Sequence, residues 1–220
     1  MNVIDLTREI SPNVKVFPGS PQPLFIRWSK FDIHGYDSEV MFMSTHTGTH
    51  MDAPCHFTQN GKSIDQIDVK RFINRRSLVL RIEKKSNELI TRQDILECRT
   101  SIEENDTIIF DTGWEMHYYK KDEEKIEDCV MANPGLAPDA SQYLVDNKVN
   151  AVATDCPSID VGIDSNFTSH KILLSNDVLV VENLSNLEKL RWEGWFAFTI
   201  APLKLTGATG SPVRAIAIID

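Results

Sequence analysis

The sequence has no long apolar run, no recognisable leader and no strongly basic stretch, and each absence excludes a class of protein. A membrane-spanning helix needs about 18 or more consecutive apolar residues, and no window of the chain approaches that length. The N-terminal segment MNVIDLTREI carries Asp5 and Glu9 where a signal peptide would be apolar. The formal net charge is −9, and no basic run is present to neutralise the phosphates of a nucleic acid. We therefore expect a soluble, cytoplasmic protein that binds neither membrane nor nucleic acid.

Cysteine is also scarce, with four residues at positions 55, 98, 129 and 156 and no CxxC pair. This spacing is typical of reduced thiols in a cytosolic protein and argues against a disulfide framework or a structural zinc site. The chain needs no such staples, because a chain of 220 residues can bury roughly 70% of the surface that it exposes when unfolded. Cys55 invites a nucleophilic role, but a small buried thiol is the commoner outcome.

Strand-like and helix-like segments are mixed along the chain, with no internal repeat or low-complexity linker. Thr91 followed by Asp94 is close to a capping box and begins a short helix, and Pro138 suits the first turn of another. The mixture predicts one α/β domain over residues 1–220, built around a mixed sheet. Strands are expected near the N-terminus (VIDLT) and at 39–46, 77–83, 106–114, 150–160, 178–181, 194–205 and 211–220; helices at 91–99, 138–149 and in a turn from 169; a solvated helix or loop at 120–128; and loops at 11–23 and 206–212.

The stretch STHTGTHMDAPCHF, residues 44–57, places His46, His50, Asp52 and His56 close together. Two histidines four residues apart would share one face of a helix, but the intervening threonines, the glycine and the nearby proline make a helix unfavourable. A strand end followed by a tight loop suits the stretch better. A lone histidine is more often a satisfied loop residue than a ligand. Three imidazoles and a carboxylate in one short segment, however, are typical of a site for Zn²⁺ or Mn²⁺.

The segment HTGTHMDAPCH resembles the HxGTHxDxPxH signature of the cyclase-like metal-dependent hydrolases, a family that includes bacterial kynurenine formamidase and isatin hydrolase. The likeness covers nearly the whole chain. Its other parts are the opening DLTREISPNVKVFPGSP, the strand end DTGW, the unit NPGLAPDASQYLVDNKVNAVATDCPSID and the segment HKILLSNDVLVVENL. The resemblance implies a single α/β domain of the swivelling β/β/α type and a homo-oligomer, dimer or tetramer, in which the N-terminal loop reaches towards the neighbouring active site.

Five metal ligands follow from the resemblance. It implies that His46, His50 and Asp52 hold one divalent ion, and that Asp52 also bridges to a second ion held by His170 and Glu182. A bridging carboxylate holds two ions about 3.5–4 Å apart. Read alone, His170 and Glu182 would be a surface histidine and a strand-end carboxylate. Glu182 ends the apolar run VLVVE, however, where an unpaired buried charge would be costly. Whether one ion or two bind stays open, as does the choice between zinc and manganese.

The resemblance further implies that His56 is the catalytic acid/base and that Phe17 contacts the substrate. Ser20 departs from the PGD that is usual in the family, so the substrate itself stays open. Other aromatic residues weighed for the substrate wall are Trp28, Phe31, Phe72 and Trp114, although most aromatic residues belong to cores. His34 and His117 are expected on the surface.

The implied activity is hydrolysis of a C–N amide bond, with an arylformamidase acting on N-formylkynurenine or a similar N-formyl arylamine as the first expectation. A bound divalent ion lowers the pKa of water to about 7 and supplies the nucleophile. Alternatives are a cyclic-amide hydrolase of the isatin type, a ring-forming cyclase and, in another class, a metal-binding protein without catalysis. In the segment TDCPSID, Asp155, Ser158 and Asp160 are interpreted first as turn caps and second as residues that orient a metal-binding histidine.

Overall fold

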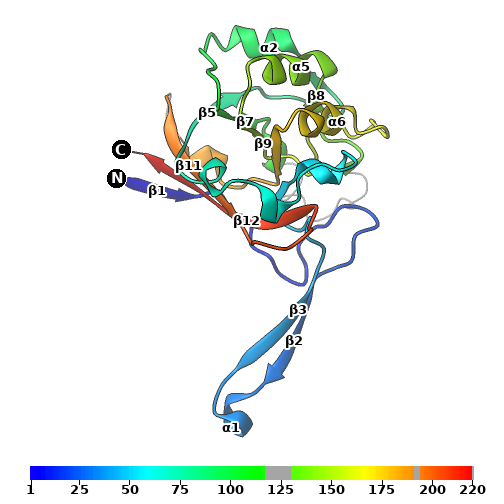
Figure 1. Ribbon diagram of the computed structural model, residues 1–220, viewed down its shortest axis with the longest axis vertical. Coiled ribbons are helices and arrows are strands. Elements are labelled where there is room, and N and C mark those ends of the chain that lie inside the picture. The colour runs from blue at the N-terminus through cyan, green and yellow to red at the C-terminus, as the bar shows by residue number, and fades with distance from the viewer. Residues whose placement is uncertain (117–129, 191–193, 220) are drawn as a thin grey trace.

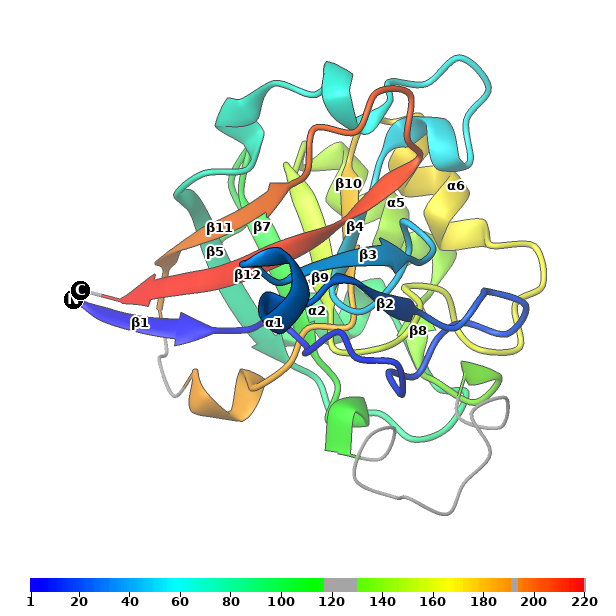
Figure 2. The same ribbon diagram turned by 90° about the horizontal axis from the view of Figure 1, so that it is seen from below.

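A sheet of mixed strand directions that closes on itself forms the centre of the fold (Figures 1 and 2). The computed structural model describes residues 1–116, 130–190 and 194–219. The sheet order is β1 (Asn2–Asp5), β12 (Gly210–Ile219), β11 (Phe196–Pro202), β5 (Arg75–Arg81), β7 (Thr107–Asp111), β9 (Ala151–Thr154), β10 (Leu179–Glu182) and β4 (His50–Asp52). Strand β4 also pairs with β12, and this second pairing closes the sheet. The expected α/β class with a mixed sheet is confirmed.

The four strands β5, β7, β9 and β10 are parallel, and their composition explains why. The middle strands are almost wholly apolar and buried on both faces, as parallel strands covered on both sides are. Alternate residues divide between two cores: Ile109 and Val181 face the inside of the closed sheet, whereas Ile108 and Val180 face the helices. Strands β4, β11, β12 and β1 complete the sheet in antiparallel pairings.

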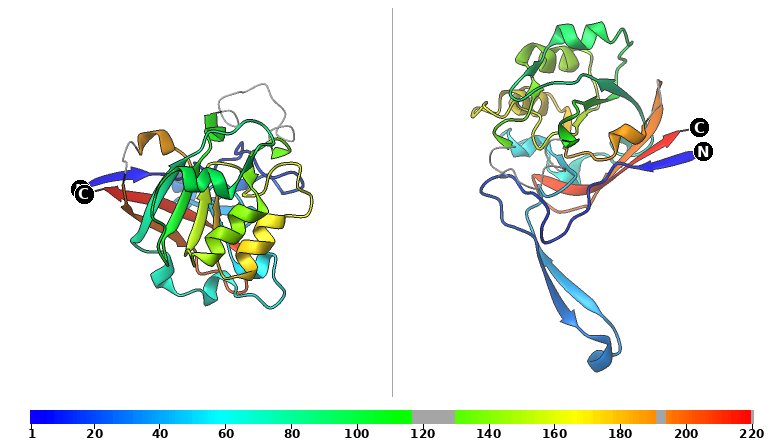
Figure 3. Two further views of the ribbon diagram at one scale, coloured as in Figure 1. Left: turned by 90° about the horizontal axis from the view of Figure 1, so that it is seen from above. Right: turned by 180° about the vertical axis from the view of Figure 1, so that it is seen from behind.

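Three helices cover the outer face of the parallel strands: α2 (Arg92–Glu97), α5 (Pro138–Asp146) and α6 (Thr168–Ser175). In Figure 3, left, α5 and α6 lie in front of these strands, in green and yellow. The expected starts are confirmed, because Thr91 and Asp94 form the capping box of α2 and Pro138 is the first residue of α5. The remaining short elements are η1 (Pro54–His56), η2 (Ile64–Gln66), η3 (Val69–Arg71), η4 (Leu187–Lys189) and the paired strands β6 (Leu89–Ile90) and β8 (Gly135–Leu136).

A two-stranded arm, made of β2 (Leu24–Ser29) and β3 (Ser38–Phe42) with the single helical turn α1 (Phe31–His34) at its tip, projects from the body (Figure 1). The sequence prediction missed β2, and its strand at 39–46 is wrong at the C-terminal end. Strand β3 ends at Phe42, a loop follows, and β4 begins separately at His50. The predicted solvated segment at 120–128 lies outside the described residues. In the part of the chain that the structure describes, no helix is long and apolar enough to cross a membrane.

Candidate metal centre

The short strand β4 turns two polar side chains to one side of the sheet. Successive residues of a strand face opposite sides, so His50 and Asp52 share a face while Met51 between them points into the inner core. In the antiparallel pairing of β4 with β10, His50 lies directly opposite Glu182. Cross-strand partners have Cβ atoms about 4.5–5.5 Å apart, so the register alone brings the Glu182 carboxylate beside the imidazole.

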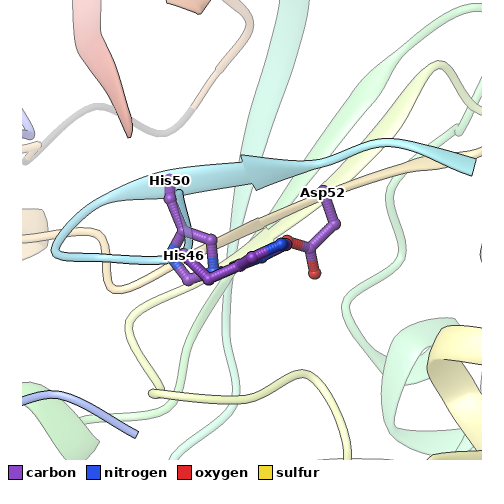
Figure 4. Close-up of side chains that lie close together, drawn as sticks. All are labelled: His46, His50 and Asp52. Carbon is purple, nitrogen blue, oxygen red and sulfur yellow. Dashed lines mark hydrogen bonds and ion pairs between the residues drawn. The ribbon is translucent and has the colours of Figure 1, made fainter. Parts of the chain in front are cut away.

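The loop before β4 brings His46 to the same place (Figure 4), where both imidazoles and the Asp52 carboxylate point to one side of the chain. Gly48 makes this reversal with a φ of +64°, a left-handed conformation that glycine adopts without strain. Its carbonyl oxygen accepts a hydrogen bond from Nδ1 of His50, 2.9 Å away. Because a carbonyl can only accept, this contact places the hydrogen on Nδ1 and leaves Nε2 bare in the neutral ring.

A third imidazole comes from helix α6, more than a hundred residues further along the chain. Nδ1 of His170 donates to the Asp160 carboxylate, which follows β9, and the Ser169 amide donates to the other Asp160 oxygen at 2.6 Å. The bare Nε2 of His170 then faces Asp52 Oδ2 at 3.1 Å and Glu182 Oε1 at 3.0 Å. A hydrogen bond of this kind, made behind a ligand, fixes the tautomer and the direction of a metal-binding histidine.

Asp52 links two three-residue groups, one with His46 and His50 and the other with His170 and Glu182, in each of which the ligand atoms lie within 4.8 Å of one another. Its Oδ1 lies 2.7 Å from His46 Nδ1 and 3.5 Å from His50 Nε2, while its Oδ2 faces His170. Ligands of one tetrahedral zinc ion, each about 2.0–2.1 Å from it, are about 3.3 Å apart. The observed separations bracket that value, so the donor set fits a divalent cation.

The charges around Asp52 point to a cation as well, since two buried carboxylates face bare imidazole nitrogens. Burial alone would lower the pKa of His170, but Glu182, Asp160 and Asp52 together raise it well above the usual value. Burial would raise the pKa of Asp52, yet the adjacent His170 and His46 imidazoles hold it well below its ordinary range. The site therefore favours positive charge, which a divalent ion supplies without a proton.

His56, on η1, is half-buried beside these groups. Among the described residues, no carboxylate is hydrogen-bonded to it. Its ring stacks on His46 with centroids 4.1 Å apart and planes 24° apart. Burial lowers the pKa of His56 to about 4 despite the nearby Asp52 charge, so the ring is neutral at pH 7.

Cys55, the neighbouring residue, is a protonated thiol. Burial raises its pKa, and its Sγ lies 3.7 Å from the Ala208 carbonyl oxygen. A thiolate nucleophile is not favoured there.

A cavity of about 240 Å³ opens over the six predicted polar residues and over Phe17. Phe17 lies at its rim, 37% exposed, with its ring centroid 6.5 Å from that of Phe167. Phe57 and Phe167 complete an aromatic wall, 5.2 Å apart between centroids. Both were missed by the sequence prediction, although Phe57 directly follows His56, the last residue of the signature. The other aromatic candidates lie elsewhere: Phe72 and Trp114 are buried away from the cavity lining, and Trp28 and Phe31 are on the arm.

The segment TDCPSID serves both of the purposes considered for it. Ser158 caps this turn as expected, because its hydroxyl accepts a hydrogen bond from the Asp160 amide at 3.2 Å. Asp155 instead holds a distant segment, because it accepts hydrogen bonds from the Thr112 hydroxyl and the Glu115 amide, about 40 residues earlier in the chain. For Asp160, the interpretation as a turn cap is wrong, because its carboxylate accepts from His170 Nδ1 and orients that ring. His34 is exposed as expected, and His117 lies outside the described residues.

Comparison with known proteins gives matches over nearly the whole chain. The family model "Cyclase", described as "Putative cyclase", matches residues 4–161. A kynurenine formamidase of Bacillus cereus is 27% identical over 214 residues, which are 97% of this chain and 95% of that one. A crystal structure of an isatin hydrolase bound to the product analogue thioisatinate superposes with a TM-score of 0.86 at 25% identity, covering 99% of this chain and 92% of that one. A solved "Potential Metal-Dependent Hydrolase With Cyclase Activity" gives a TM-score of 0.77 at 26% identity, over 98% and 96% of the two chains.

Proposed function

Because the chain belongs to the cyclase family, we propose that it is a metal-dependent hydrolase of C–N amide bonds that acts on N-formylkynurenine or a similar N-formyl arylamine. One observation carries the proposal: two groups of buried ligand atoms share the Asp52 carboxylate, and a neutral imidazole, His56, stands beside them in an aromatic cavity. The similarity to a curated kynurenine formamidase supports the substrate class.

The proposed ligands are His46, His50 and Asp52 for one ion and Asp52, His170 and Glu182 for a second. The two Asp52 oxygens face different partners, which favours a bridging role and two ions. When bound, a divalent ion such as Zn²⁺ or Mn²⁺ lowers the pKa of water and polarises the carbonyl of the substrate.

His56 is the proposed acid/base. Since its pKa of about 4 leaves the ring neutral at pH 7, a ring nitrogen of His56 first accepts a proton from the attacking water. The same nitrogen then donates that proton to the departing arylamine. The ring thus ends the cycle neutral, as it began, and the proton leaves with the amine.

The cavity suits an aryl amide better than an aliphatic one. Phe17, Phe57 and Phe167 line it, and aromatic rings pair favourably at centroid distances of about 4.5–7 Å. An aryl group placed against this wall would direct its amide towards the polar residues. A substrate ring seated on this wall would exclude water from that side of its amide bond.

A cyclic amide of the isatin type is the second candidate, supported by the structural similarity to an isatin hydrolase. The same residues would hydrolyse it, so only the substrate differs. A metal-binding protein without catalysis is the alternative of another class, and His56 argues against it, because ion binding alone needs no neutral imidazole beside the ligands.

The experiment begins with protein purified without chelators, whose metal content is measured before and after stripping. Zn²⁺ or Mn²⁺ is then restored and hydrolysis of N-formylkynurenine and of isatin is measured. We expect activity to disappear with the metal, to return with it, and to favour the formamide. Activity that survives complete stripping would refute the metal-dependent mechanism, and binding without turnover of either amide would favour the non-catalytic alternative.

We also propose that the whole chain, 1–220, is one domain and that it assembles with a second copy of itself. The arm exposes large apolar side chains, among them Trp28 at 72%, Phe31 at 64% and Phe42 at 61%. An isolated two-stranded hairpin is marginally stable in water, so a partner surface is needed to cover it. Light scattering should give a dimer or tetramer, and Trp28→Glu should shift it towards monomer; a monomeric wild-type chain would refute the assembly.

We propose a cytoplasmic location for the protein, which the three free thiols in the described residues support.

A further inference from the structure

We propose that the loop before β12, residues 206–209, is part of the metal centre together with Gly210 at the start of that strand, and that the Thr209 hydroxyl is a positioning group that makes His46 offer Nδ1 to the ion. The inference rests on the proposed function, because it concerns how one proposed ligand is held. The loop lies about 160 residues from the histidine signature in sequence, and its Thr and Gly residues look like those of an ordinary turn.

The first observation is the contact itself. Nε2 of His46 lies 2.9 Å from Thr209 Oγ1, and Nδ1 of the same ring lies 2.7 Å from Asp52 Oδ1. Nδ1 therefore faces the ligand atoms of the proposed ion, and Nε2 faces away from them. A hydrogen on Nε2 donates to the hydroxyl and leaves Nδ1 bare, which is the form that binds a metal.

The second observation is a space that only glycine leaves. In the pairing of β12 with β4, Gly210 lies opposite Asp52. A Cβ atom at Gly210 would come within 2.5 Å of His46 Cε1 and 2.9 Å of His46 Nδ1, far inside van der Waals contact. The His46 ring thus lies against the bare backbone of Gly210, and His56 stacks on it 4.1 Å away between centroids. The ring is therefore held by the His56 stack, by the close Gly210 backbone and at both nitrogens.

The third observation is that hydrogen bonds to its backbone groups hold this loop firmly. The Ala53 amide donates to the Thr209 carbonyl at 2.8 Å and the Ile64 amide to the Ala208 carbonyl at 3.0 Å. The Gly207 amide donates to Asp65 Oδ1 at 2.9 Å. Threonine is also stiff at χ1, so the hydroxyl has a defined position.

The three imidazoles are consequently not equivalent. His50 is oriented by a carbonyl and His170 by a carboxylate, and both present Nε2. His46 is oriented by a hydroxyl and presents Nδ1. A neutral hydroxyl makes the ring behind it a weaker base than a carboxylate does, so the Thr209 contact acts on geometry more than on basicity.

The test compares Thr209→Val, which keeps the shape and removes the hydroxyl, with Thr209→Ser, which keeps the hydroxyl. Thr206→Val is the matched control, since Thr206 is exposed three residues earlier in the same loop. Zn²⁺ affinity is measured by competition with a chromophoric chelator, and thermal unfolding without metal checks that each variant folds. We expect Thr209→Val to bind about 10–100-fold more weakly, and Thr209→Ser and Thr206→Val to stay within about threefold of wild type.

A second readout needs no variant. Long-range ¹H–¹⁵N spectra of the zinc-loaded wild-type protein show which nitrogen of His46 carries the hydrogen, and we expect Nε2. Wild-type affinity in Thr209→Val, or a hydrogen on Nδ1 of His46, would overturn the inference while leaving metal-dependent hydrolysis intact. A wild-type protein that binds no Zn²⁺ or Mn²⁺ would overturn the inference and the proposed function together.

Discussion

Replacing Asp160 by asparagine should disable the metal centre although Asp160 is not a proposed ligand. The Asp160 carboxylate accepts two hydrogen bonds, from the Ser169 amide at 2.6 Å and from His170 Nδ1. An asparagine side chain has one acceptor oxygen. If that oxygen keeps the Ser169 amide, the NH₂ group faces His170 Nδ1 and can only donate to it.

The consequence is a change of tautomer. His170 would have to move its hydrogen from Nδ1 to Nε2, the nitrogen that lies 3.0 Å from Glu182 Oε1 and 3.1 Å from Asp52 Oδ2. A protonated Nε2 cannot bind a metal ion. Loss of a hydrogen bond behind a ligand weakens metal binding about 10–100-fold, equivalent to about 1.4–2.8 kcal/mol.

The assay is chelator competition for Zn²⁺ at fixed pH, with hydrolysis measured in parallel. Asp146→Asn is the matched control, because it removes the same charge from an exposed position at the end of α5. Asp160→Asn should lose affinity for the metal, and Asp146→Asn should not. An Asp160→Asn protein that binds Zn²⁺ as tightly as wild type would refute the reasoning from tautomer to ligand.

Three further predictions concern separate parts of the molecule. His56→Ala should lower kcat about 10²–10⁴-fold when assayed at saturating Zn²⁺, and full activity would contradict the acid/base role. Burial and the nearby Asp155 raise the pKa of Asp111 to about 6. Between about pH 4 and 6, Asp111 is therefore protonated in the folded chain and ionised in the unfolded chain. Stability should fall as pH rises through that window, and Asp111→Asn should remove the fall and add about 1–2 kcal/mol at pH 7 in urea unfolding; an unchanged pH profile would count against it. Gly210→Ala should displace the His46 ring and weaken Zn²⁺ binding at least tenfold by chelator competition, and wild-type affinity would show that the ring does not need that space.

Local sequence patterns predicted the parts of the fold that depend on local physics. The capping residues Thr91 and Asp94 are three positions apart, and the apolar runs of β7, β9 and β10 need only burial on both faces. The closure of the sheet through β4 and β12 was not predictable in this way, because it joins residues about 160 positions apart. Strand β2 of the arm was missed because its large apolar side chains are exposed, which reverses the usual relation between hydrophobicity and burial.

In the candidate site too, residues in contiguous motifs were predicted from the sequence, and residues that act only through their place in the fold were not. The signature between His46 and His56 is contiguous, and the likeness of a second segment, HKILLSNDVLVVENL, to the same family indicated His170 and Glu182. The structure brings all of these residues to one cavity. The orienting role of Asp160 was only the second interpretation of its segment, and Thr209 was not considered. An aspartate or threonine that holds an imidazole has no spacing of its own, and its role depends on the direction of the ring.

The most direct measurement is anomalous diffraction from crystals grown with Zn²⁺ or Mn²⁺, recorded on either side of the metal absorption edge. One or two peaks should lie about 2.0–2.2 Å from the His46, His50, Asp52, His170 and Glu182 donor atoms, with Asp52 between them if there are two. Metal bound only elsewhere, in a crystal of protein that hydrolyses N-formylkynurenine, would contradict the proposed centre.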